Sequence, residues 1–137
     1  MDSPKVILIG NSASGKTTTC YKLNGVPVKY IDPARPLDRQ SLNGVIVPTI
    51  GVEVHPHRAP SGTTYNLWDK AGKEKLGRRG DGHYIGAKIA LIFHGGEEYR
   101  TPQQWEGDVR RVAPNAQVYH IGGSFEEKRA KVCEILA

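Results

Sequence analysis

Eight residues near the start of the chain, "GNSASGKT" at 10–17, have the spacing G-x-x-x-x-G-K-[ST] of a phosphate-binding loop. An apolar run precedes them and a helical pattern follows, which is the context this motif requires. The backbone N–H groups and the helix N-terminus would hold phosphates, Lys16 would lie against the β- and γ-phosphates, and the Thr17 hydroxyl would coordinate Mg²⁺. The expected phosphate-site residues are Asn11, Ser12, Ala13, Ser14, Gly15, Lys16, Thr17 and Thr18.

Two further segments could complete this chemistry. In "WDKAG" (68–72), Asp69 could reach the Mg²⁺ shell through water, and Gly72 could offer its N–H to a γ-phosphate. In "VPTIGVEV" (47–54), Thr49 could complete the Mg²⁺ shell and sense the γ-phosphate. An aspartate-to-glycine turn or a loop threonine is ordinary by itself. Together with the phosphate loop, both segments favour a metal-assisted phosphate site.

The elements that must position these residues follow from the apolar pattern. Strands are expected at 5–10, 51–58, 63–69, 88–94 and 117–122, with the second and third forming a hairpin. Helices are expected from the phosphate loop to Asn24, over 101–113 with Thr101 as N-cap, and over 124–137 with Ser124 and Glu127 as a capping box. This order predicts an α/β domain: a mostly parallel sheet of about five strands, helices on both faces, and the first hairpin strand antiparallel at one edge.

The terminal helix has apolar residues that share one face. We expect Phe125, Val132 and Leu136 to face the core. Residues 26–48 have no steady period and predict a long loop.

Composition limits the class of protein. A chain of 137 residues predicts one domain over 1–137. The net charge is +5, but the basic residues are scattered, so we expect a polyanionic small ligand and no nucleic acid. No apolar run approaches the roughly 20 residues that cross a bilayer, and "CEILA" is no prenylation signal. We expect a soluble cytoplasmic or nuclear protein without a membrane anchor. Cys20 and Cys133 are expected as buried, reduced thiols, and the histidines show no metal-ligand spacing.

Residues 4 to about 94 resemble the small GTPases of the Ras superfamily, and most of all the Ran branch. The resemblance rests on the phosphate loop, "PTIGVEVHP" and "WDKAGKEKLGRRGDGHYIGA". It implies a Ras-like P-loop NTPase fold, shortened at its C-terminal end, that binds GTP or GDP with Mg²⁺. It also implies importin-type transport receptors or other Ran effectors and regulators as partners, met through residues 48–56 and 70–87, the latter being the second switch segment.

Two side chains depart from the family pattern at the catalytic positions. Lys73 stands where the family has the glutamine that positions the attacking water, and lysine has three donors but no acceptor. Ser12 stands where the family usually has glycine, and its side chain would crowd the γ-phosphate. The catalytic candidates are Lys73, at the water-positioning position, and Lys16 of the phosphate loop. Because of Lys73 and Ser12, we expect slow or impaired GTP hydrolysis.

Two segments also depart from the family. The loop over 26–47 is longer than in the family; its Tyr30 could stack near the base, and either Arg35 or Arg39 could act as a finger. The base-reading motif Asn-Lys-x-Asp is absent, so guanine selectivity is in question. The strand over 117–122 can be aligned with either of the family's last two strands, and Gly122–Ser124 could offer backbone contacts to a base.

Three functions remain open from the sequence. The leading one is a Ran-like GTP/GDP switch acting in nucleocytoplasmic transport. The second is a pseudo-GTPase that occupies Ran partners without hydrolysis or strict guanine selectivity. The third is a small-molecule kinase, which shares the phosphate loop but for which no acceptor site is recognisable.

Overall fold

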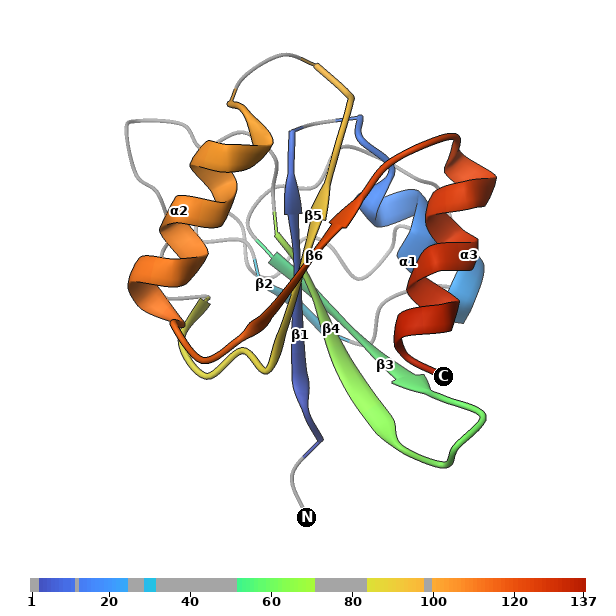
Figure 1. Ribbon diagram of the computed structural model, residues 1–137. Coiled ribbons are helices and arrows are strands. Elements are labelled where there is room, and N and C mark those ends of the chain that lie inside the picture. The colour runs from blue at the N-terminus through green and yellow to red at the C-terminus, as the bar shows by residue number, and fades with distance from the viewer. Residues whose placement is uncertain (1–2, 12, 25–28, 32–51, 71–83, 98–99) are drawn as a thin grey trace.

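A six-stranded sheet, in the order β2-β3-β4-β1-β5-β6, forms the centre of the computed structural model (Figure 1). The structure describes residues 3–11, 13–24, 29–31, 52–70, 84–97 and 100–137. Its strands are β1 (Lys5–Gly10), β2 (Lys29–Ile31), β3 (Val52–Arg58), β4 (Thr64–Lys70), β5 (Ile89–Phe93) and β6 (Gln117–Ile121). Its helices are α1 (Lys16–Asn24), α2 (Pro102–Val112) and α3 (Phe125–Ile135).

The strand directions confirm the mostly parallel α/β fold. β1 is parallel to both β4 and β5, and β5 is parallel to β6. β3 is antiparallel to both of its neighbours, so among the described strands it alone runs against the others. The predicted edge position of β3 is wrong, because β2 pairs with it on the outside. This three-residue strand lies inside the segment that the sequence predicted as loop.

Strand alternation divides the core into two layers, one on each face of the sheet. On β1, Ile7 and Ile9 face α2, while Val6 and Leu8 face α1 and α3. The α2 layer is completed mainly by Trp105 and Val109. Figure 1 shows α2 on one side of the sheet and α1 with α3 on the other. Helices on both faces, which the element order predicted, are confirmed.

The hairpin of β3 and β4 is confirmed, with Ala59 and Thr63 paired at its turn. β3 contains Pro56, a residue without an N–H for a ladder. β2 pairs with β3 only as far as Val54. Beyond Val54, no described strand pairs with the outer side of β3, so an N–H pointing to that side has no strand partner to bond. A proline is tolerated there for that reason.

Capping fixes where the two later helices begin. Thr101 caps α2, and Ser124 caps α3 in a capping box with Glu127, both as predicted. Thr101 also forms a capping box with Gln104, which the sequence analysis did not predict. Val132 and Leu136 are buried, which confirms the core face of α3. Phe125 is 52% exposed, so its predicted core position is wrong. It lies on the first turn, which extends past the apolar core toward the phosphate loop.

The helices of the described ranges are also informative about membranes. None of them is long and apolar enough to cross a bilayer.

Candidate nucleotide site

The candidate site lies where parallel strands end at a common edge of the sheet. The phosphate loop follows β1, and Asp69 lies near the end of β4, which pairs with β1. His94 follows β5, and Gly122 follows β6. β1 lies between β4 and β5 in the sheet, so the chain that follows β1 goes to one side of it and the chain that follows β4 goes to the other. Ligands of open α/β sheets bind at such a switch point.

Glycine is required at two positions of the phosphate loop. Gly10 has φ of 145°, and a Cβ there would lie 2.5 Å from the Phe93 carbonyl oxygen. Gly15 has φ of 99°, and a Cβ there would lie 3.2 Å from the Phe125 ring. Between them Ala13 also adopts a positive φ, 64°, and its side chain is exposed. The loop is therefore a tight turn that larger residues at 10 and 15 would distort.

Lys16 lies inside this turn. Its ammonium donates to the carbonyl oxygens of Gly10 and Asn11, both at 2.9 Å, and to Ser14 Oγ at 3.3 Å. Burial lowers the pKa of Lys16 to about 8, although the negative charge of Asp69 acts in the opposite direction. The ammonium form still prevails at pH 7. A positive charge is thus held at the centre of the loop, where phosphates would bind.

Thr17 and Asp69 meet beside that charge. The Thr17 hydroxyl donates a hydrogen bond to Asp69 Oδ2. Asp69 is wholly buried, and burial raises its pKa to about 6, against the lowering effects of Lys16 and of the Thr17 hydrogen bond. A hydroxyl oxygen and a carboxylate are the oxygen donors that Mg²⁺ prefers in proteins. The residues present therefore fit a magnesium-nucleotide complex.

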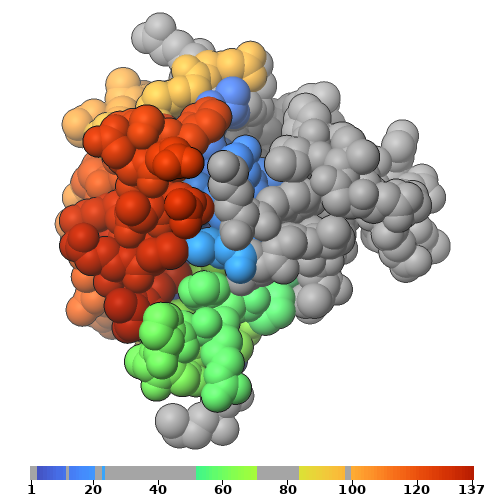
Figure 2. All heavy atoms as spheres, turned by 90° about the vertical axis from the view of Figure 1, so that its right-hand side faces the viewer, coloured from blue at the N-terminus to red at the C-terminus, as the bar shows by residue number. Residues whose placement is uncertain are grey.

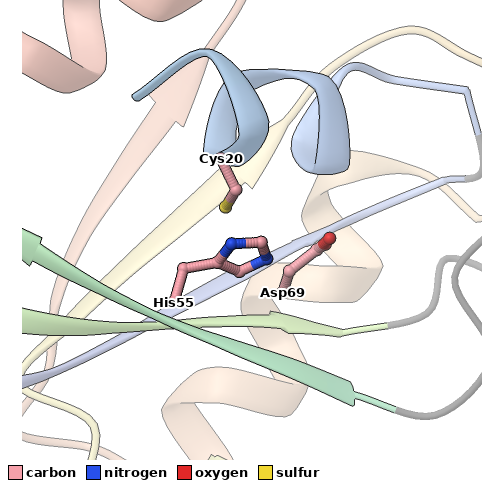
Figure 3. A group of neighbouring side chains, drawn as sticks. All are labelled: Cys20, His55 and Asp69. Carbon is pink, nitrogen blue, oxygen red and sulfur yellow. The ribbon is translucent and has the colours of Figure 1, made fainter. Parts of the chain in front are cut away.

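Asp69 belongs to a buried polar cluster that the sequence did not reveal. Glu53 of β3 is opposite Asp69, and His55 Nε2 lies 3.4 Å from Glu53 Oε1. Figure 3 shows the His55 ring between Cys20 of α1 and Asp69 of β4. The donor atoms of Cys20, His55 and Asp69 all lie within 4.8 Å of one another. Glu53 raises and His55 lowers the pKa of Asp69, so this cluster tunes the charge of the candidate metal ligand.

Asn11 ties the phosphate loop to the α2 side of the sheet. Its Nδ2 donates to the Arg100 carbonyl oxygen at 2.8 Å, and its Oδ1 accepts from the Arg100 N–H at 3.0 Å. The Trp105 indole N–H also donates to Oδ1, at 3.2 Å. Asn11 is nearly buried, so these three hydrogen bonds replace those it would form with water. Its described contacts fix the loop rather than point to a ligand.

Lys128 ties the same loop to α3. Its ammonium donates to the Ser14 carbonyl oxygen at 2.7 Å and to the His94 carbonyl oxygen at 2.5 Å. Figure 2 shows α3 lying directly beside the start of α1. A lysine in a terminal helix gives no local signal of such a contact, so sequence reasoning missed this residue.

The structure brings together only part of the predicted site. Of the predicted residues, it places Ser14, Lys16, Thr17 and Asp69 around one point and Asn11, Ala13, Gly15 and Thr18 along the same loop and helix start. Tyr30 lies in β2, and its side chain is not described. Ser12, Thr49, Gly72 and Lys73 lie outside the described residues, as do Arg35 and Arg39. Their roles stay predictions.

The strand order places the last predicted strand, although its alignment with either of the family's last two strands stays open. β6 pairs directly with β5, so Gly122–Ser124 follows the strand next to β5 and leads straight into α3. The first turn of α3 therefore lies against the phosphate loop, as the contacts of Lys128 show.

Fold and site together define a phosphate-loop domain of the Ras-superfamily type. A family model described as "Ras of Complex, Roc, domain of DAPkinase" matches residues 5–126, nearly the whole chain. The chain belongs to this Roc family of small-GTPase-like domains. Membership confirms the Ras-superfamily resemblance and the α/β P-loop fold, and it implies guanine-nucleotide binding. The family match does not assign the chain to the Ran branch.

Proposed function

We propose that this Roc-family chain is a GTP/GDP switch that holds its nucleotide with Mg²⁺ and hydrolyses GTP slowly. The observation that carries the proposal is the hydrogen bond between Thr17 and Asp69 beside the buried ammonium of Lys16. A hydroxyl, a carboxylate and an ammonium from the loop and from β4 thus meet at one point. Phosphoryl-transfer sites of P-loop proteins need these three groups.

The contacts of Lys16 suggest how phosphate would be accommodated. Its two bonds to loop carbonyls, at 2.9 Å, hold the side chain across the loop. Its longest bond, 3.3 Å to Ser14 Oγ, is the one that a phosphate oxygen would replace. Thr17 would donate its oxygen to Mg²⁺, and Asp69 would act through water. When bound, Mg²⁺ neutralises charge on the β- and γ-phosphates.

The switching part of the proposal rests on residues outside the described ranges. Thr49 and Gly72 would sense the γ-phosphate, within a switch region before β3 and a second one over 70–87. Lys73 would hold the γ-phosphate by charge instead of orienting water, and Ser12 would crowd it. Both substitutions would slow hydrolysis.

Single-turnover hydrolysis of bound GTP tests this assignment. The double variant Lys73→Gln with Ser12→Gly should hydrolyse GTP faster than the unaltered chain. Glutamine is a neutral side chain that can both donate and accept hydrogen bonds, so it can orient the attacking water. Lys16→Ala should bind nucleotide at least about 100-fold more weakly and serves as the negative control. A double variant that binds GTP but is no faster would remove Lys73 and Ser12 as the cause of slow turnover.

We also propose Ran-type transport partners, a finer assignment than the family match. It is supported by the similarity of residues 48–56 and 70–87 to the Ran switch segments. The described part of the first segment limits this proposal: Val52–His55 is buried and Pro56 is exposed. The shared residues Val52–His55 therefore build the fold. A partner would meet Pro56 and, within the second segment, the exposed Ile85.

Capture by immobilised importin-type receptors tests the partners and separates the switch from a pseudo-GTPase. The chain should be captured when loaded with a non-hydrolysable GTP analogue and released with GDP. Equal capture with and without nucleotide would favour the pseudo-GTPase, which the altered Lys73 position makes the second candidate. Failure of capture in every state would contradict the transport assignment while leaving nucleotide binding intact.

A further inference from the structure

One aromatic side chain is exposed next to the phosphate loop. Within the described ranges, the large apolar side chains that are exposed are Ile85, at 64%, and Phe125, at 52%. A Cβ built on Gly15 would lie 3.2 Å from Phe125 Cδ1 and 3.3 Å from Cε1. The Phe125 ring therefore borders the phosphate loop at Gly15. The ring can approach this closely because glycine has no side chain. An exposed ring is unfavourable in water, and the core packing of α3 does not require it there.

The position of this ring is fixed by the residue one turn later. Lys128 is bonded to the carbonyl oxygens of Ser14 and His94, and its ammonium lies 5.7 Å from the Phe125 ring centroid. Its Cδ would lie 3.8 Å from a Cβ on Gly15, so its stem also lies along the loop. The first turn of α3 is thus clamped onto the phosphate loop from one side. The rest of the ring surface remains open to solvent.

We propose that the open surface of the Phe125 ring is the stacking platform for the base of the nucleotide whose phosphates occupy the loop. The inference rests on the proposed nucleotide binding. A base joined to those phosphates through its ribose must lie near the loop, and the Phe125 ring presents an aromatic surface there. Stacking on aromatic rings suits any base, because every base has a π-face.

The platform would account for base binding in a chain that lacks Asn-Lys-x-Asp. Stacking contacts the face of a base and does not read its edge, so guanine and adenine should gain similar affinity from Phe125. Selectivity between the two bases must then come from other residues. Removing the Phe125 ring should therefore lower the affinities for GDP and ADP by similar factors.

The experiment compares binding of GDP, ADP and inorganic pyrophosphate to the full chain with Mg²⁺, by calorimetry. Phe125→Ala should weaken GDP and ADP by similar factors, each roughly 5- to 150-fold, which is the usual range for a lost base stack. Pyrophosphate has no base, so its affinity should be unchanged within about twofold. Phe125→Trp should restore nucleotide affinity, whereas Phe125→Leu, which is apolar but not aromatic, should not.

Ile85→Ala is the matched control, because Ile85 is the other exposed large apolar residue and its carbonyl bonds to Lys5 at the start of β1. It should change none of the three affinities. Unchanged GDP affinity in Phe125→Ala would overturn the platform while leaving nucleotide binding standing. An equal loss of pyrophosphate would also overturn it, since that result would mean a disturbed loop. If the unaltered chain binds neither pyrophosphate nor nucleotide, the proposed function itself fails.

Discussion

The ammonium of Lys128 donates a hydrogen bond to the backbone carbonyl oxygen of Ser14, 2.7 Å away, across 114 positions of sequence. With Asn11 on the opposite side, it holds the phosphate loop between the two helical layers. The loop is therefore braced by Lys128, Arg100 and Trp105, which lie outside the motif. The candidate site depends on α2 and α3 as much as on its own sequence.

Lys128→Met should destabilise the chain, because methionine keeps the apolar stem but leaves the carbonyls of Ser14 and His94 without this donor. Loss of a buried hydrogen-bonded partner typically costs about 1–3 kcal/mol. Urea unfolding followed by circular dichroism would measure the free energy of unfolding. Lys131→Met is the control on the same helix, since Lys131 is exposed and pairs with Glu134. Equal losses in both variants would show that the Lys128 contacts do not stabilise the loop.

Asn11→Ala should also destabilise the chain, through the other side of the loop. The substitution removes three hydrogen bonds to Arg100 and Trp105 in a nearly buried place. We expect a loss of about 2–4 kcal/mol in the free energy of unfolding, from roughly 1 kcal/mol for each bond and the groups left unsatisfied. A loss below about 0.5 kcal/mol, as for an ordinary surface substitution, would contradict this role.

Thr17→Ala should remove most of the Mg²⁺ dependence of nucleotide binding. The hydroxyl that would coordinate the ion is lost, and so is the hydrogen bond that orients Asp69. The affinity for GDP with Mg²⁺ should fall by roughly 10- to 100-fold, while the affinity in EDTA should change little. Thr17→Ser keeps the hydroxyl and should behave like the unaltered chain. Full Mg²⁺ dependence in Thr17→Ala would contradict the assigned metal site.

Lys16 should make the ligand-free protein more stable as the pH rises above about 8. Burial lowers its pKa from 10.5 in the unfolded chain to about 8 in the folded one, so the unfolded state binds more protons between these values. The free energy of unfolding should therefore increase with pH over this window, relative to Lys16→Met. The full effect is on the order of 3 kcal/mol. Chemical unfolding at pH 7.5 and 9.5 measures the part of this effect that falls between these two values, on the order of 2 kcal/mol. A constant difference between the two proteins would contradict the buried charged lysine.

The sequence predicted the parts of this molecule that rest on local patterns. Apolar runs located β1 and β5, and the capping box of Ser124 and Glu127 located the start of α3. The phosphate-loop motif located Lys16 and Thr17, because its spacing alone places them at a strand-to-helix turn. Combining two motifs assigned Thr17 and Asp69 to one Mg²⁺ site, and the structure places the two side chains in direct contact.

What the sequence missed depends on contacts between distant elements. β2 is only three residues long and gains its strand conformation from pairing with β3. The hydrophobic periodicity of the sequence therefore did not predict this strand. Phe125 had the spacing of a core residue, but the first turn of α3 extends beyond the apolar layer. His55 approaches Cys20 and Asp69 only after three elements have packed together, so spacing along the chain could not reveal it.

Direct titration of the chain with GDP in the presence of Mg²⁺, compared with Lys16→Ala, tests the central claim. The unaltered chain should bind one GDP per molecule, and Lys16→Ala should bind at least about 100-fold more weakly, because it lacks the charge held inside the loop. A folded unaltered chain that binds neither GDP nor GTP, or a Lys16→Ala variant that binds GDP equally well, would contradict the account.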